Sequence, residues 1–200
     1  MLNFDWFFQG KHEMFYFFSY VLFLTFLFWY IGVGDFLVCF VGVLLITFSY
    51  LALEKRIAKK YGCSAVYKLN PIYILFSLVL AFFKIPMTLL GITEIHPYRY
   101  GRWGFKVISL GRLEIGYVGF SGIAVTLGLS ILFKFLSIFS SFFIPFYKIA
   151  AIISFYNLLF IPDSEGFKIY SWSPGLWIFL LIIAGFMAAD VAFVLGFATE

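Results

Sequence analysis

Charged side chains are scarce in this chain, and their scarcity sets the class of protein. Lys, Arg, Asp and Glu together make up 12% of its 200 residues, roughly half of their share in a typical soluble domain. Hydrophobic residues make up 64% and aromatic residues 24%, which leaves too little polar surface to coat a water-soluble particle. The composition therefore excludes a soluble enzyme, a disordered chain and a fibre, and it predicts a membrane protein whose main partner is the lipid bilayer.

Cysteine and histidine are also rare, which removes several kinds of site. The two cysteines, Cys39 and Cys63, provide no disulfide framework and no metal cluster. The two histidines, His12 and His96, lack the His-x-x-x-His spacing that presents two zinc ligands on one helix face. The sequence also contains no Cys-x-x-Cys pair, no phosphate-binding glycine loop and no Gly-x-Ser-x-Gly elbow. We expect His12 and His96 to be interfacial side chains.

Long apolar runs take the place of the missing charges. A helix needs about 20 apolar residues to cross the hydrocarbon of a bilayer, and five runs approach this length. They predict an all-α membrane protein, a polytopic helical bundle that forms a single integral membrane domain over residues 1–200. We expect the full spans at residues 14–34, 36–53, 115–137, 142–162 and 174–196.

Residues 71–92 are ambiguous, because Lys84 and Pro86 interrupt their apolar run. A sixth span here would divide eleven basic residues six to five between the two sides of the membrane, whereas a re-entrant hairpin would place all eleven on one side. Those residues are Lys11, Lys55, Arg56, Lys59, Lys60 and Lys68, and then Arg99, Arg102, Lys106, Arg112 and Lys168. The positive-inside rule favours the hairpin and five spans, with the N-terminus and the basic loops in the cytoplasm, and six spans remain the alternative.

The basic loop at 93–114 has a second pattern. From Thr93 to Arg112, aromatic and β-branched residues alternate with basic residues between glycines, which is typical of short strands at the membrane surface. Nucleic-acid binders also mix basic and aromatic residues. Beside a membrane, however, an aromatic belt with inner-leaflet lysines and arginines is the favoured interpretation, and we expect no nucleic-acid partner.

Three stretches near the ends of the spans carry motif evidence. They are Tyr50-Leu51-x-x-Glu54-Lys55 with Ala58 and Tyr61-Gly62, then Glu114-x-Gly116 with Ser121-Gly122-Ile123-x-x-Thr126, and then Asn157-x-x-Phe160 with Asp163-x-Glu165-Gly166, Lys168 and Trp172. In their order and placement on helices, these stretches resemble the three motifs of the site-2 protease family of intramembrane zinc metallopeptidases. The resemblance covers roughly Phe36 to Pro174 and implies a site-2-protease-like core with a short surface strand region.

The chain departs from this family at the residues that perform the chemistry. The family's zinc-binding histidines correspond to Tyr50 and Glu54, its general-base glutamate to Leu51, and its aspartate ligand to Glu165. A leucine cannot accept a proton from zinc-bound water, and tyrosine is a poor zinc ligand. These departures predict a pseudoprotease with no catalytic residues and no zinc cofactor.

The remaining carboxylates leave two interpretations open. Tyr50 and Glu54 are four residues apart and share a helix face, and the resemblance implies that Glu165 approaches them. Glu54 and Glu165 could hold a divalent cation through oxygen ligands. Alternatively, they are helix-end charges that neighbouring lysines neutralise, with Lys55 and its neighbours beside Glu54 and Lys168 beside Glu165, and we favour this interpretation.

Two polar residues within the predicted spans have structural explanations. Asp190 either faces a partner inside the bundle or lies at the outer interface, and Asn157 is expected to form an interhelical hydrogen bond. For the whole chain we predict a catalytically inactive homologue that binds or regulates transmembrane helices of other proteins. One alternative is a metallopeptidase-like enzyme with a carboxylate-bound metal, and another is a small transporter or channel.

Overall fold

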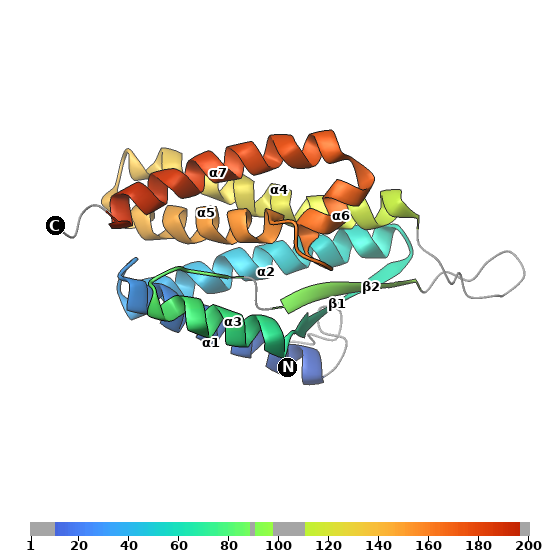
Figure 1. Cartoon of the computed structure of the whole chain (residues 1–200), viewed down its shortest axis with the longest axis horizontal. Coiled ribbons are helices and arrows are strands. Elements are labelled where there is room, and N and C mark those ends of the chain that lie inside the picture. Colours follow the sequence, from blue (N-terminus) through green and yellow to red (C-terminus); the bar gives the residue numbers. More distant parts are fainter. Residues whose placement is uncertain (1–10, 89–90, 98–110, 197–200) are drawn as a thin grey trace, which may run out of the picture.

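The computed structural model describes residues 11–88, 91–97 and 111–196. The elements are arranged with the two-stranded sheet toward one end of the helices, which we call the sheet end, and the opposite end is the far end (Figure 1). Their order along the chain is α1 (Lys11–Ile31), α2 (Phe36–Lys60), β1 (Cys63–Leu69), α3 (Pro71–Phe82), β2 (Gly91–Pro97), α4 (Arg112–Ser137), the 3-10 turn η2 (Ser141–Phe143), α5 (Ile144–Leu158), α6 (Glu165–Trp172) and α7 (Pro174–Gly196).

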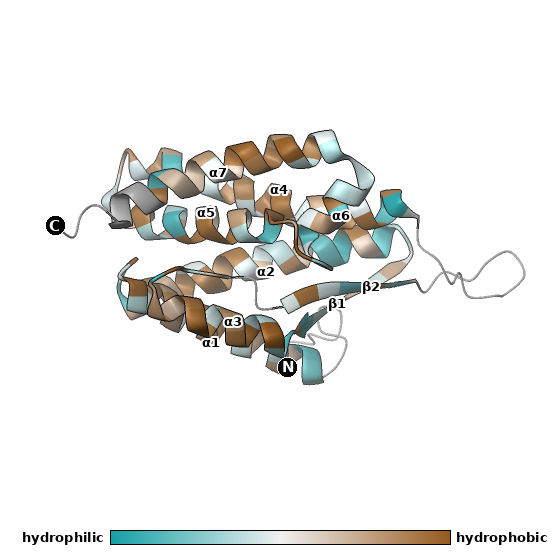
Figure 2. Ribbon diagram, viewed as in Figure 1, coloured by the Kyte–Doolittle hydropathy of each residue, from teal (hydrophilic) through white to brown (hydrophobic). Residues whose placement is uncertain are grey.

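Among the described residues, five helices are long and apolar enough to cross a bilayer. Hydrophobic residues dominate all of them (Figure 2), and many large apolar side chains on their outer surfaces are exposed. The chain is therefore a multi-pass membrane protein, as its composition predicts. The candidate spans are His12–Ile31, Phe36–Lys60, Arg112–Ser137, Ser141–Leu158 and Pro174–Val191.

Several predicted spans differ in their boundaries from the observed helices, and the span expected at 14–34 ends at Ile31. The differences at α2 and α5 are larger. The span expected at 36–53 continues as a helix to Lys60. The charges of Glu54 and Lys55 do not end it, because Glu54 is buried inside the bundle and Lys55 forms an ion pair with Glu13. The span expected at 142–162 ends at Leu158. There the chain turns, with Asp163 in the left-handed region at φ 63°, and a separate short helix, α6, begins at Glu165.

Between β1 and β2 the chain forms a hairpin, described over residues 70–88, that returns to the strand from which it departed. The antiparallel register of β1 and β2 pairs Leu69 with Gly91, so the chain returns beside the residue from which it departed. Between them, α3 has 12 residues and extends only about 18 Å. The chain reverses at Lys84, where φ is 57°. The described residues of the range 71–92 therefore turn back and contain no sixth helix long enough to cross a membrane.

The return arm of this hairpin is not helical, so its backbone needs partners inside the protein. The hydroxyl of Ser77 in α3 donates a hydrogen bond to the carbonyl of Met87, and the hydroxyl of Tyr20 in α1 donates to the carbonyl of Thr88 at 3.5 Å. Met87 and Thr88 are both buried. The bond from Tyr20 attaches the hairpin to α1, and both bonds give the carbonyls of the irregular arm a partner.

The strand prediction is partly correct. β2 begins at Gly91 and overlaps the start of the region 93–114, but β1 was not predicted at all. Residues 98–110 of that region lie outside the described residues. The inner face of the sheet buries Cys63 and Ala65 in a small apolar cluster with Ala58 and Val118, so the sheet packs on α2 and α4.

Helix α4 is central, since it contacts α2, α5 and α6. Near the far end, Asp190 of α7 forms an ion pair with Lys134 of α4 and accepts a hydrogen bond of 2.8 Å from the hydroxyl of Tyr147 in α5. Asp190 is only partly covered by protein. It therefore has both properties that the sequence offered as alternatives, a position near the surface and a specific partner.

Candidate functional site

The candidate site begins with two side chains on one face of α2. Tyr50 and Glu54 are both buried, and Glu54 has no exposed surface. They contact α4 at Gly122, where a Cβ atom would lie 2.7 Å from Glu54 Oε1 and would also overlap the Tyr50 ring. Gly122 therefore permits α4 to approach α2 closely enough to enclose both side chains.

Helix α6 contributes the second carboxylate and a lysine. The Ser164 hydroxyl caps the helix by accepting a hydrogen bond of 3.2 Å from the Phe167 backbone N–H, and this places Glu165 in the first turn and Lys168 one turn later. Lys168 Nζ lies 2.7 Å from Glu165 Oε1. Glu165 is 3% exposed and Lys168 8%, so this is a buried ion pair.

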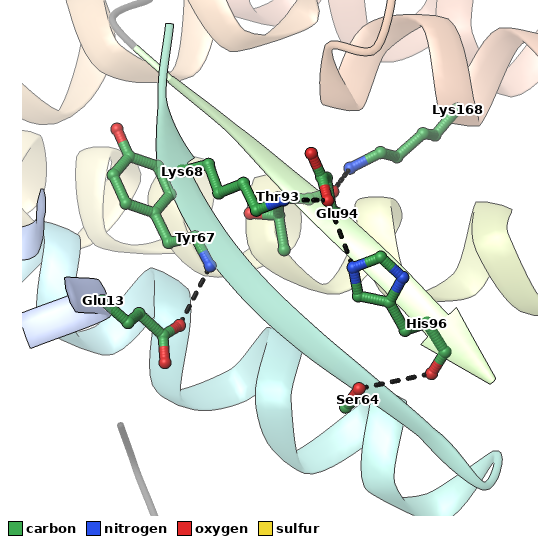
Figure 3. A network of polar contacts seen from close by, with 8 residues as sticks. All are labelled: Glu13, Ser64, Tyr67, Lys68, Thr93, Glu94, His96 and Lys168. Carbon is green, nitrogen blue, oxygen red and sulfur yellow. Dashed lines mark hydrogen bonds and ion pairs between the residues drawn. The ribbon is translucent and has the colours of Figure 1, made fainter. Parts of the chain in front are cut away.

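Thr93 of β2 connects the two helices. Its hydroxyl donates a hydrogen bond of 2.9 Å to Glu54 Oε2, and its carbonyl accepts one of 2.6 Å from Lys168 Nζ. The register explains why this carbonyl is available. Thr93 pairs with Tyr67, whose N–H points away from β2 to Glu13 Oε1 at 2.9 Å (Figure 3). In such a non-hydrogen-bonded pair, the backbone N–H and C=O groups of each residue point away from the partner strand, toward the open edges of the sheet.

The Glu54 and Glu165 carboxyl groups are direct neighbours, and Tyr50 lies beside both. The structure thus brings together the three polar positions that the sequence singled out. One oxygen of each carboxyl group, Glu54 Oε1 and Glu165 Oε2, is buried without a hydrogen-bond partner among the described residues. Two neighbouring carboxylates with one lysine are not electrically balanced, so a proton or a second cation is needed between them.

Leu51 and Lys55, which the sequence also singled out, lie away from this carboxyl cluster. Leu51 is buried in the apolar core, and Lys55 forms its ion pair with Glu13 of α1 at 2.6 Å. The interpretation of Glu54 as a helix-end charge that nearby lysines neutralise is therefore wrong, because Glu54 points into the bundle. The corresponding interpretation of Glu165 is confirmed by its ion pair with Lys168.

This set of donors does not fit a catalytic zinc ion. Such an ion takes three protein ligands and leaves one position for water. The cluster offers two carboxylates, and its third group is a phenol, which is a poor zinc ligand. No group of three His, Cys, Asp or Glu side chains converges on a metal position within the described ranges. The divalent-cation alternative has the two free oxygens in its favour, but the Lys168 ammonium already occupies one side of Glu165.

The sequence did not single out Thr93 as a site residue. A single threonine in a basic loop has no distinguishing pattern, and its role becomes visible only from the strand register. Trp172, known only as a continuation of the third motif, packs on Tyr117 with ring centroids 4.6 Å apart. Gly116 allows this contact, since a Cβ there would overlap Trp172.

A cavity of about 570 Å³ lies along β2, between this strand, the start of α4 and α6. Its walls combine apolar side chains such as Ile115 and Phe167 with charged ones, and Lys168 connects it to the buried carboxyl cluster. Glu94, Arg112 and Asp163 are the other charged residues of its lining.

The outer face of the sheet carries charged side chains. Glu94 Oε2 lies 2.7 Å from Lys68 Nζ and 3.1 Å from His96 Nε2 (Figure 3). The hydrogen bond from Lys68 holds the pKa of Glu94 below its ordinary value, so Glu94 stays charged at neutral pH. His96 is exposed, as expected of an interfacial side chain.

No family model, no curated protein and no solved structure matches this chain.

We predict that Gly122→Ala destabilises the protein, because the added methyl group overlaps Tyr50 and Glu54. Overpacking of this kind costs about 1–3 kcal/mol. The matched control is Gly128→Ala on the same helix, where a Cβ meets nothing within 4 Å. Thermal unfolding in detergent micelles, followed by circular dichroism, measures both variants, and equal unfolding temperatures would contradict the close packing at Gly122.

We also predict that Lys168→Met lowers the free energy of unfolding by about 3–5 kcal/mol, since it leaves the buried Glu165 charge without its partner. Adding Glu165→Gln should restore most of the loss, because the uncompensated charge is then gone. Denaturant titration of both single variants and the double variant forms a double-mutant cycle. A loss of the same size in the Glu165→Gln background would show that the ion pair is not the cause.

Proposed function

We propose that this chain is a non-catalytic, site-2-protease-like membrane protein that binds an extended segment of a membrane-anchored partner. The observation that carries the proposal is the cavity along β2, whose lining includes Lys168, the ion-pair partner of the buried Glu165. A partner segment in this cavity would lie beside the carboxyl cluster without meeting a group that can activate water.

The arrangement of the three motif stretches supports the resemblance on which this proposal depends. They are far apart in the sequence and were related only by their order. In the fold, residues from each of them meet, since Glu54 of α2 and Glu165 of α6 are neighbours and glycines of α4 adjoin both carboxyl groups.

The outer edge of β2 supports an extended binding mode. Ile95 lies two residues beyond Thr93 and pairs with Ala65, so its backbone groups also point away from β1. The cavity includes residues Ile92 to His96 and therefore runs along this edge. An added strand would form backbone hydrogen bonds there, and the apolar wall would receive its alternate side chains.

The proposed orientation places the N-terminus, the sheet end and the basic loops in the cytoplasm. The positive-inside rule supports it, because the five-span arrangement gathers eleven basic residues on one side of the membrane. We expect a reporter inserted at Ser140, in the turn between α4 and η2, to be extracytoplasmic, and a reporter at the N-terminus to be cytoplasmic. Activity of a pair of compartment-specific enzyme fusions measures this. Two reporters on the same side would contradict the five-span arrangement.

Site-specific photocrosslinking tests the binding proposal. A photoreactive amino acid at Phe167, which lines the cavity, should capture a membrane-anchored partner through its juxtamembrane segment. The matched control is Tyr170 on the same helix, which has nearly equal exposure (39% against 38%) and does not line the cavity. We expect at least a severalfold higher yield at position 167, with the partner recovered at its full length.

Two outcomes would contradict this proposal. Equal yields at positions 167 and 170 would show that the cavity does not select a partner. A partner that is recovered cleaved, and whose cleavage stops in Glu54→Gln or Glu165→Gln, would show that the carboxyl cluster is catalytic.

A further inference from the structure

A separate groove lies between α1 and α3. Its volume is about 250 Å³, and its wall is formed by five side chains of α1 between Phe23 and Tyr30 together with Leu78 and Ala81 of α3. Every residue in this set is apolar or aromatic. The small side chain of Ala81 leaves space where a larger residue would close the contact between the two helices.

The α1 wall is held in place by aromatic packing. The ring of Trp29 lies 6.3 Å from that of Phe26 and 6.1 Å from that of Phe36 at the start of α2, in edge-to-face geometry. Trp29 and Tyr30 still expose about half of their surface. The groove is therefore lined by rings whose positions are fixed but whose outer faces are free to contact a ligand.

A basic residue, Lys84, follows the α3 wall of this groove along the chain. The backbone N–H of Lys84 donates a hydrogen bond of 2.9 Å to the carbonyl of Ala81, so Lys84 is one turn beyond the groove wall. Its side chain is exposed and forms no ion pair with any described residue. Ala81 shares this groove with Trp29 and Tyr30, close to the end of α1 at Ile31.

The end of α1 marks the depth of these groups in the membrane. The turn between α1 and α2 includes the charged Asp35, and a turn that joins two spans lies near the headgroups, here at the far end. Trp29 and Tyr30 just before it match the aromatic belt of a membrane interface. Lys84 can therefore extend to the lipid phosphates while the groove itself lies among the acyl chains.

We propose that this groove binds one acyl chain of an anionic glycerophospholipid in the leaflet at the far end, with the lipid phosphate on Lys84. The size of the groove supports a lipid, because a second helix is about 10 Å wide with its side chains and cannot enter. The free ammonium group supports an anionic headgroup, since it has no carboxylate partner among the described residues. This site is independent of the partner-binding cavity at β2.

Quenching of tryptophan fluorescence tests the proposal. The protein is reconstituted in phosphatidylcholine vesicles that contain increasing fractions of phosphatidylglycerol with brominated acyl chains, and the signal of Trp29 is obtained by subtracting a Trp29→Phe variant. We expect Trp29 to be quenched at a lower fraction of brominated phosphatidylglycerol than of brominated phosphatidylcholine. Lys84→Gln should raise the half-saturating fraction of the anionic lipid roughly fivefold, and Lys84→Arg should not.

Filling the groove gives an independent measurement. Ala81→Phe should reduce quenching of Trp29 by both brominated lipids, whereas Leu75→Phe, which adds bulk to a lipid-exposed position of α3 outside the groove, should leave it unchanged. Equal half-saturating fractions for the two lipids in the unaltered protein would overturn the proposal. The proposal would also be overturned if neither lipid quenched Trp29, since a helix of a second copy or of another protein would then cover this surface.

Discussion

The ammonium group of Lys168 holds the polar interior of this protein together. It neutralises Glu165 on its own helix and donates to the carbonyl of Thr93 on β2, while the Thr93 hydroxyl reaches Glu54 on α2. One buried cation thus connects elements that are distant in the sequence. Burying the Lys168 charge is unfavourable unless it is paired and hydrogen-bonded, so the positions of α2, α6 and β2 depend on one another.

Close approach of the backbones makes this arrangement sterically feasible. Glycines on α4 lie against the Glu165 and Glu54 carboxyl groups, and Gly166 at the start of α6 lies against the backbone of Leu158 at the end of α5. At each of these positions a Cβ atom would collide with its neighbour. The polar cluster therefore depends on small residues around it as much as on its own charges.

Several features of the fold can be predicted directly from the sequence. Hydrophobic length predicts the spans, because a helix must be about 20 residues long to cross the hydrocarbon, and the distribution of basic residues favours a hairpin at 71–92 over a sixth crossing. The helical spacing of Tyr50 and Glu54 predicts their common face. The motif order led us to expect Glu165 beside them, and the structure places it there.

Other features were beyond sequence reasoning, for identifiable physical reasons. The strand β1 alternates between buried and more exposed residues, but over only seven residues, and it is stabilised by its partner and by Glu13. The end of α5 at Leu158 could not be located from apolar length, because Phe160 and Ile161 continue the hydrophobic run through a turn. Long-range partners, such as Thr93 for Lys168, depend on strand register, which a single sequence does not specify.

The pairing of Leu69 with Gly91 also separates two properties that are usually linked in membrane proteins, the length of a hydrophobic segment and the side of the membrane on which the next helix begins. Because the hairpin returns to its starting strand, lengthening or shortening α3 by whole turns would change how far the hairpin extends from the sheet. It would not change the side on which α4 begins. The length of the hairpin is thus a variable that this architecture can adjust while the orientation of every later helix stays constant.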